Sequence, residues 1–155
     1  MPKHSAGILL YRQRQGALEV LLVHPGGPYW QRRDAGAWSI PKGEYQEGEQ
    51  PLATAWREFE EELGAPPEGD ALPLGEVVQA GGKRVIAFAI AGDFDPRSLK
   101  SNFFEMEWPP GAGTTQRFPE VDRAEWFAIP EARARINAAQ GAFLERLETI
   151  IRRKG

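Results

Sequence analysis

The chain contains no cysteine, which excludes disulfides and thiolate metal sites. Any metal site must therefore use oxygen ligands or the two histidines. The chain also lacks an excess of positive charge, because 19 Lys and Arg against 22 Asp and Glu give a net charge of −3. Long nucleic acids and anionic membranes are accordingly not expected as partners, although a local basic patch is still possible.

Long apolar runs are absent as well. The stretch "AGILLY" at residues 6–11 is too short to span a bilayer, and residues 1–4 are too short and polar for a signal peptide. We therefore expect a cytoplasmic protein. The sequence has no internal repeat and no low-complexity tract, and its 155 residues suit a single domain over residues 1–155.

The hydrophobic pattern predicts more strands than helices. Strands are expected over residues 5–12, 16–24, 75–79, 84–91, 102–108 and 124–129. Helices are expected to begin at Pro51 and Pro130, because proline suits the first helical position, and Gly64 is placed to end the first of them. An apolar stripe over 143–151 predicts a further helix. This order favours α+β or an α/β/α sandwich with a mixed sheet over a regular βαβ repeat.

The first helix carries the sequence "REFEEELG" at residues 57–64. At about 100° per residue, Glu58, Glu61 and Glu62 share one patch, whereas Glu60 points elsewhere, close to the arginine. Its core stripe is expected to comprise Leu52, Ala55, Trp56, Phe59 and Leu63. The acidic patch is either a solvated face or a set of carboxylates that binds a divalent cation. The second interpretation is favoured because the helix has no lysine to relieve the repulsion and because Glu62 lies beside the apolar stripe.

The segment "GEYQEGEQPLATAWREFEEELGA" resembles the Nudix box, G-x5-E-x7-R-E-U-x-E-E-x-G-U, in which U is a bulky apolar residue. The matching residues are Gly43, Glu49, Arg57, Glu58, Phe59, Glu61, Glu62 and Gly64. Phe59 stands where an aliphatic residue is usual, and the small Ala65 occupies the last apolar position. The resemblance implies a Nudix-type α/β/α sandwich and a pyrophosphohydrolase that cleaves a phosphoanhydride bond.

The resemblance also implies a metal site. Glu58, Glu61 and Glu62 match the family's ligands for Mg²⁺ or Mn²⁺, with Glu61 and Glu62 expected to bind the ion directly. The backbone carbonyl of Gly43 would complete the coordination, since a residue without a side chain lets the loop close over the ion. A carboxylate, or a hydroxide on the ion, would take the proton from the attacking water.

Residues around the helix complete this prediction. Arg57 and Glu49 match a structural pair that orients the carboxylates as a supporting shell. Glu120, in "FPEVDRAEWF", resembles the "PE…W" pattern of bacterial RNA pyrophosphohydrolases and is predicted to be a further metal ligand or catalytic base; the alternative is a surface glutamate. Glu105 and Glu107 are weaker candidates, because a strand glutamate that faces solvent needs no other explanation.

The loops before the helix bear on the substrate. Lys42, in "WSIPKGE", gives the Pro-Lys-Gly form that resembles hydrolases of diadenosine and diphosphoinositol polyphosphates, and some enzymes that remove oxidised nucleotides share it. A lysine here can bind a polyphosphate as a point charge, or it can be an exposed loop residue. Base stacking and phosphate binding are predicted for Tyr29, Trp30, Arg32 and Arg33, with a loop that covers the core through Trp30 as the alternative.

The predicted function is Mg²⁺-dependent hydrolysis of a small nucleoside polyphosphate, either a dinucleoside polyphosphate or an NTP, by a monomer or homodimer. One alternative is a pyrophosphohydrolase of RNA 5′ ends, for which a basic stripe could be formed by Arg12, Arg14, Arg32, Arg33, Lys42 and Arg84. The other is a non-catalytic domain that binds nucleotides, although such domains usually lose box glutamates that this chain retains.

Overall fold

The computed structural model describes residues 3–154, and its main sheet is built around strand β1 (His4–Arg14). One edge of β1 pairs in parallel with β5 (Arg84–Ala91). Its other edge pairs antiparallel with β2 (Ala17–Pro25) along the C-terminal half and with β3 (Lys42–Glu44) along the N-terminal half. The outer strands are β4 (Leu72–Val78), beside β5, and β8 (Val121–Ala128), beside β2.

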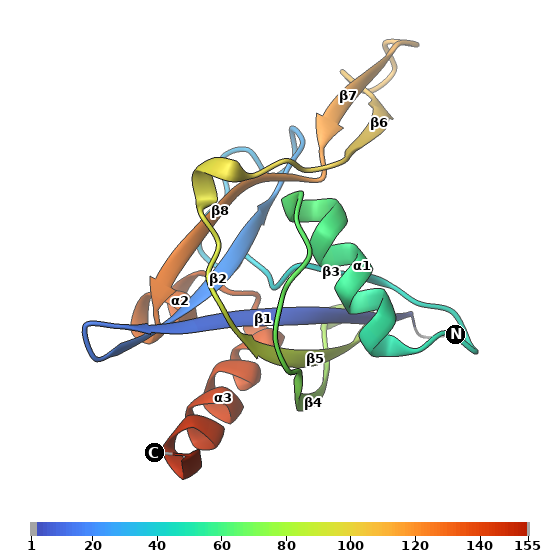
Figure 1. Cartoon of the computed structure of the whole chain (residues 1–155). Coiled ribbons are helices and arrows are strands. Elements are labelled where there is room, and N and C mark those ends of the chain that lie inside the picture. The colour runs from blue at the N-terminus through green and yellow to red at the C-terminus, as the bar shows by residue number, and fades with distance from the viewer. Residues whose placement is uncertain (1–2, 155) are drawn as a thin grey trace.

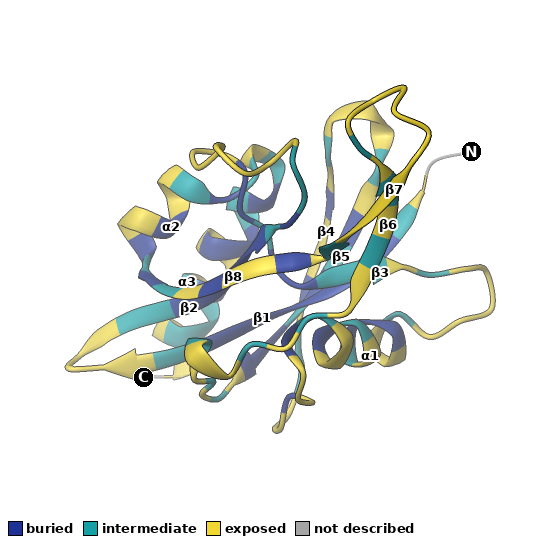
Figure 2. Cartoon of the chain, turned by 90° about the horizontal axis from the view of Figure 1, so that it is seen from above, coloured by how far each residue is buried: buried dark blue, intermediate teal, exposed yellow. Residues whose placement is uncertain are grey.

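Helices cover both faces of this sheet (Figures 1 and 2). Helix α1 (Pro51–Leu63) lies on one face, and α2 (Ile129–Arg135) and α3 (Gly141–Lys154) lie on the other. Short 3₁₀ turns η1 (Ala80–Gly82), η2 (Pro96–Ser98) and η3 (Ala138–Gln140) connect the elements. The predicted α/β/α sandwich with a mixed sheet is confirmed. Within residues 3–154, no helix has the length and apolar character needed to cross a membrane.

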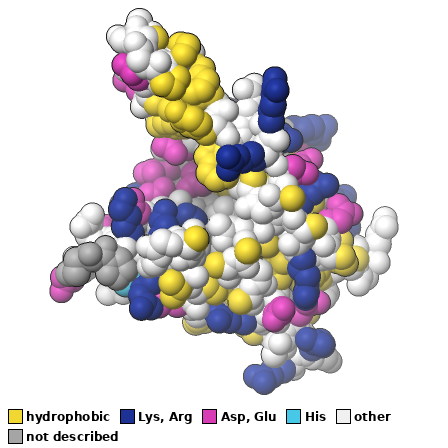
Figure 3. All heavy atoms as spheres, turned by 180° about the vertical axis from the view of Figure 1, so that it is seen from behind, with side chains coloured by type: hydrophobic (Ala, Val, Ile, Leu, Met, Phe, Trp, Pro, Cys, Tyr) yellow, Lys and Arg dark blue, Asp and Glu magenta, His cyan; other side chains and the backbone are white. Residues whose placement is uncertain are grey.

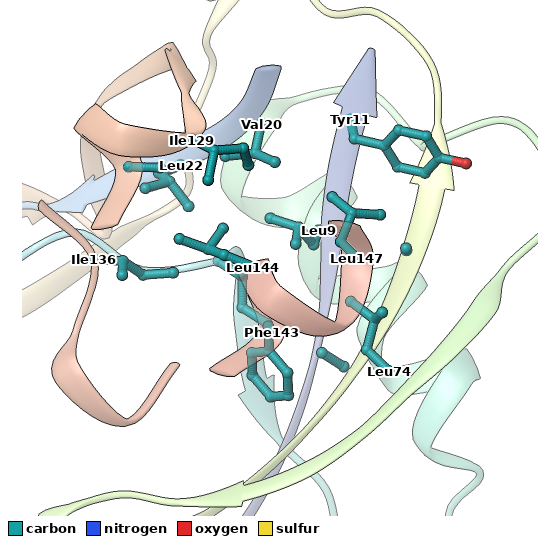
Figure 4. Close-up of a cluster of buried hydrophobic side chains, with 14 of the residues drawn as sticks. Leu9, Tyr11, Val20, Leu22, Leu74, Ile129, Ile136, Phe143, Leu144 and Leu147 are labelled. Carbon is teal, nitrogen blue, oxygen red and sulfur yellow. The ribbon is translucent and has the colours of Figure 1, made fainter. Parts of the chain in front are cut away.

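The alternation of side chains along β1 divides the core into two layers. Ala6, Ile8 and Leu10 face α1, whereas Leu9 and Tyr11 face the C-terminal helices. Figure 4 shows the second layer, in which the labelled side chains from the sheet and the helices converge: Leu9, Tyr11, Val20, Leu22, Leu74, Ile129, Ile136, Phe143, Leu144 and Leu147. One layer therefore anchors α1, and the other anchors the C-terminal helices.

Truncation of Phe143 is expected to destabilise this second layer. Phe143 is fully buried, so Phe143→Ala should leave a cavity and lower the free energy of unfolding by about 3–5 kcal/mol. Urea denaturation monitored by tryptophan fluorescence would measure the change. The exposed Ala138→Gly variant serves as a mild control, and a loss below about 1 kcal/mol for Phe143→Ala would contradict the prediction.

Helix α1 has the ends that the sequence predicts. Pro51 is its first residue, and Gly64 follows in the left-handed conformation (φ 94°), donating its N–H to the carbonyl of Glu60 at 2.8 Å. Three residues of the predicted core stripe, Ala55, Phe59 and Leu63, are buried, and Trp56 is half-buried. The prediction for Leu52 is wrong, because this side chain is exposed and Thr54 occupies the buried position in the first turn.

A second, two-stranded sheet projects from the body of the molecule (Figure 1). It consists of β6 (Phe103–Glu107) and β7 (Thr115–Pro119). The base of this hairpin is fixed by two backbone hydrogen bonds: Asn102 donates to the carbonyl of Glu61 at 2.9 Å, and Glu120 donates to that of Asn102 at 2.9 Å. These bonds hold Glu120 beside α1, although the two are distant in sequence.

Candidate active site

A cleft of about 360 Å³ opens where α1, the start of β1, β3 and the base of the hairpin meet. Figure 3 shows acidic side chains in a hollow below the projecting hairpin, with basic side chains directly beside them. The cleft is lined by Ser5, Lys42, Gly43, Glu44, Glu58, Glu61, Glu62, Lys83, Asn102 and Glu120. Nearly every side chain in this set is polar or charged, which suits a charged ligand better than an apolar one.

The cleft brings together the carboxylates that the helical spacing groups. Glu58, Glu61 and Glu62 all line it, whereas Glu60 is exposed and does not. Glu120 joins them from the base of the hairpin. The structure therefore places the three predicted ligands in the cleft and Glu60 outside it, and the later acid also lies in the cleft.

Burial and mutual repulsion disturb the ionisation of these acids. The pKa of Glu62 lies well above its ordinary value, first because the carboxyl is buried and second because Glu58 is close. The pKa of Glu58 is also raised, by burial and then by Glu61, and Glu120 contributes repulsion to both. Carboxylates that are gathered at a cost in electrostatic energy favour the approach of a cation.

Two basic side chains, Lys42 and Lys83, line the same cleft as the acids. Burial is the main cause that lowers the pKa of Lys42, to about 8, and the neighbouring ammonium of Lys83 is the second. The carboxylate of Glu62 acts in the opposite direction on Lys42. The cleft thus holds two cationic side chains close together in addition to its acids, which suits a ligand that carries both phosphate groups and a metal ion.

Arg57 supports the acidic side. Its guanidinium lies 3.9 Å from the carboxylate of Glu49, so the predicted contact is present. It also lies 3.5 Å from Glu58 and 3.7 Å from Glu61. The helix therefore has an arginine at i, i+4 that relieves part of the repulsion, whereas Glu60, which the helical projection places near Arg57, does not pair with it.

The residues fit a divalent cation in the chemistry of their donor atoms. Every predicted ligand offers an oxygen atom, as Mg²⁺ and Mn²⁺ prefer. A Cβ atom at Gly43 would collide with the side chain of Glu58, so the glycine leaves the space in which this carboxylate lies. No group of three His, Asp or Glu side chains in residues 3–154 forms a ready metal cage, and Glu58 and Glu61 lie within ion-pair distance of Arg57 instead.

The loop between β2 and β3 lies away from these groups. The lining of the cleft does not include the four residues for which the sequence predicts substrate contacts, Tyr29, Trp30, Arg32 and Arg33. Tyr29 packs edge-on against Trp108 of the hairpin, with ring centroids 5.3 Å apart. Trp30 is 39% exposed, whereas Trp38, which follows the loop, is fully buried. The structure therefore favours a hairpin contact for this loop.

Four lining residues are not predicted from the sequence: Ser5, Glu44, Lys83 and Asn102. Glu44 directly follows Gly43 within the box, whereas the other three lie far from the box in sequence and no motif marks them. The sheet brings them in, because β1 pairs with both β3 and β5 and because the hairpin starts beside α1. Only the pairing of the strands could identify them.

The chain is similar to known proteins over most of its length. A family model described as "NUDIX domain" matches residues 1–147. An RNA pyrophosphohydrolase of Rhodospirillum rubrum is 40% identical over 78 residues, which cover 48% of this chain and 44% of that protein. The match therefore spans less than half of that relative.

Two solved structures share the fold. The binary complex of a C. elegans Ap4A hydrolase superposes with a TM-score of 0.68 at 19% identity, covering 96% of this chain and 98% of that one. The NUDIX domain of Shewanella oneidensis NrtR complexed with ADP ribose superposes with a TM-score of 0.65 at 15% identity, covering 97% and 89%. At these identities, the similarity establishes the arrangement of strands and helices.

Proposed function

The chain belongs to the Nudix family, and on that premise we propose that it hydrolyses a phosphoanhydride bond of nucleoside polyphosphates, with dinucleoside polyphosphates or nucleoside triphosphates as substrates. The observation that carries this proposal is the composition of the cleft, in which Glu58, Glu61, Glu62 and Glu120 lie together with Lys42. Carboxylates bind the divalent ion that accompanies a polyphosphate, and the ammonium binds its oxygens.

The site would hold Mg²⁺ or Mn²⁺ through Glu58, Glu61 and Glu62, with Glu120 and the carbonyl of Gly43 available as further ligands. When bound, the ion would neutralise the charge on the phosphate oxygens near the attacked phosphorus. Arg57 would keep two of the carboxylates oriented through its contacts with Glu58 and Glu61.

The side chains of the cleft would perform the remaining steps. Lys42 would bind phosphate oxygens and fix the orientation of the chain. A cleft carboxylate with a raised pKa would accept the proton of the attacking water, because a base is most effective when its pKa approaches the working pH. The pKa values of Glu58 and Glu62 are both raised, which is the direction of change that this role requires.

A pyrophosphohydrolase of RNA 5′ ends is the second candidate, and the name of the R. rubrum relative supports it. The predicted basic stripe supports it less. Arg12 is paired with Glu19 at 2.8 Å and with Asp93, and Arg84 is paired with Glu76 at 2.9 Å. Cations that are already neutralised contribute less to binding a long RNA backbone.

A substrate panel tests this proposal. Dinucleoside polyphosphates, NTPs, oxidised dNTPs, ADP-ribose and 5′-triphosphorylated RNA would be incubated with the protein and Mg²⁺, and the products resolved by mass. We expect a dinucleoside polyphosphate or an NTP to have the highest kcat/KM, and EDTA to abolish turnover in every reaction. Restoration of activity by excess Mg²⁺ is the control for the chelator.

The panel separates the alternatives. Highest activity on RNA would establish the second candidate, and highest activity on ADP-ribose would show that Lys42 does not select long polyphosphates. Turnover that is unaffected by EDTA, or no turnover of any compound with Mg²⁺ or Mn²⁺, would contradict the proposed hydrolase.

A further inference from the structure

One face of the projecting hairpin is aromatic and begins at the wall of the cleft. Backbone hydrogen bonds continue the pairing of β6 and β7 to Asn102 at the base and to Trp108 further out. Because side chains alternate along a strand, Phe104 and Trp108 share one side of β6 with Asn102, and Phe118 stands opposite Phe104 on that side. Asn102 lines the cleft, and Figure 3 shows hydrophobic side chains on the hairpin above the acidic hollow. The aromatic face therefore continues the cleft outward.

The loop between β2 and β3 packs on this face at two points. Gly27 passes so close to Phe104 that a Cβ atom on the glycine would lie 3.0 Å from the ring. Further out, Tyr29 meets Trp108 edge-on, with the ring centroids 5.3 Å apart and the ring planes at 82°. Loop and hairpin thus form one aromatic platform, which consists of an inner pair, Phe104 and Phe118, and an outer pair, Tyr29 and Trp108.

The outer pair keeps open ring surface. Tyr29 is 58% exposed, and Trp108 is half-buried. Rings that meet edge-on cover each other's faces only in part, and the free face of an aromatic ring is a surface on which a planar base stacks. In the same loop, the guanidinium of Arg33 lies 5.5 Å from the ring centroid of Trp30. A positive charge in this loop suits a base that is joined to phosphates.

The arrangement of the platform indicates what it binds. Nearly every side chain that lines the cleft is polar or charged, so a nucleoside joined to phosphates in the cleft needs an apolar surface beside it. The platform adjoins the cleft and supplies that surface. Trp108 lies four residues beyond Phe104, which corresponds to about 14 Å along a strand. One base cannot cover both pairs, so the outer pair is available to a second base on the same phosphate chain.

We propose that Tyr29 and Trp108 bind the second nucleobase of a dinucleoside polyphosphate whose phosphates lie in the cleft. This inference rests on the proposed function, and of the two substrate classes named there it selects the dinucleoside polyphosphates. A compound with a single nucleoside leaves the outer pair unused. The additional stacking contact should therefore give diadenosine tetraphosphate a lower KM than ATP.

Trp108→Leu tests the outer pair with compounds that differ in their number of bases. It should raise KM for diadenosine tetraphosphate about five- to fiftyfold, which is the usual effect of losing one stacked base, and change kcat less than about threefold. The KM for ATP and the inhibition constant of inorganic tripolyphosphate should stay within about twofold. Trp108→Phe should retain KM for diadenosine tetraphosphate within about threefold, and Tyr29→Leu should repeat the effect of Trp108→Leu from the loop side.

Phe103→Leu is the matched control on the same hairpin. Phe103 precedes Phe104 and so lies on the opposite face, where its ring is 54% exposed and contacts the guanidinium of Arg117, 4.5 Å from the ring centroid. All three constants should stay within about twofold in this variant. The assignment would be overturned if Trp108→Leu weakened ATP as much as diadenosine tetraphosphate, or if Phe103→Leu matched the effect of Trp108→Leu.

Two further measurements separate other occupants of the platform. A 5′-triphosphorylated dinucleotide presents its second base as an RNA end does. An effect of Trp108→Leu on this compound but not on diadenosine tetraphosphate would replace the proposed ligand by RNA. Light scattering would show whether a second copy of the chain covers the platform instead: a wild-type dimer that Trp108→Leu converts to a monomer, with KM unchanged, would also overturn the assignment.

A binding measurement separates this inference from the proposed function. Diadenosine tetraphosphate with methylene groups in place of its bridging oxygens cannot be hydrolysed, and it would be titrated calorimetrically with Mg²⁺ present. Wild-type binding that is weakened at least about fivefold in Trp108→Leu and unchanged in Phe103→Leu would support the outer pair, even if no nucleotide were hydrolysed. An active wild type whose Trp108→Leu and Tyr29→Leu variants have unchanged KM and unchanged probe binding would overturn the inference and leave the proposed function intact.

Discussion

Replacement of Glu62 by glutamine is expected to lower kcat about 10²–10⁴-fold on whichever nucleotide the wild type cleaves best. Glu62 lines the cleft close to both Glu58 and Lys42. It is also a predicted direct ligand of the ion. Glutamine keeps its shape but neither ionises nor accepts a proton. Steady-state kinetics at saturating Mg²⁺ would measure the loss.

The same variant should be more stable than the wild type at neutral and alkaline pH. A carboxyl whose pKa is raised by folding contributes stability that is complete below its ordinary pKa and is lost as the pH rises through the raised value. Glutamine carries no such penalty, so the difference in melting temperature should grow with pH and vanish below about pH 4. Added Mg²⁺ should raise the melting temperature of the wild type more than that of Glu62→Gln.

Glu60→Gln is the matched control for this experiment. It removes the same charge from the same helix, but Glu60 is exposed and outside the cleft. Its kcat should remain within about twofold of the wild type, because exposed charges contribute little. Retention of more than a tenth of the activity in Glu62→Gln would contradict a catalytic or metal-binding role for Glu62.

The acidic side of the cleft can be predicted from the sequence because three of its carboxylates lie within one helix. Residues on one helix are related by a fixed angle, so the spacing of Glu58, Glu61 and Glu62 is sufficient to place them on one patch. The end of the helix at Gly64 follows from the glycine's freedom to adopt a positive φ. Glu120 could be identified by its pattern alone, and its position in the cleft depends on the hairpin base.

Apart from Lys42, the basic side of the cleft does not follow from the sequence, since it depends on which strands pair. Ser5 and Lys83 are about 80 residues apart, and only the parallel pairing of β1 with β5 brings them together. Strand β7 is missed for a related reason: "TQRFP" has no apolar alternation, and its pairing with β6 sets its conformation. The contact of Tyr29 with Trp108 could not be predicted either, because it depends on where the hairpin places Trp108.

Replacement of Gly43 by alanine is the second change with a large expected effect. The new Cβ atom would overlap the side chain of Glu58, which must then leave its place. Glu58 is a flexible side chain, so the fold should tolerate the shift, and the melting temperature should fall by only a few degrees. Activity should fall about 10²-fold, because a displacement of about 1 Å in a group that orients the reaction has an effect of this size.

Gly141→Ala is the control, because it makes the same substitution at a glycine outside the cleft. Gly141 begins α3, has no atom near the site of a new Cβ and adopts a helical φ of −54°, so alanine should leave both activity and stability unchanged or slightly improve stability. Gly43→Ala with wild-type kcat/KM would show that Glu58 need not occupy its present place. Because Gly43 also lies in β3 opposite Ala6, a large fall in melting temperature would instead show that the strand, and not the carboxylate, yields to the new methyl group.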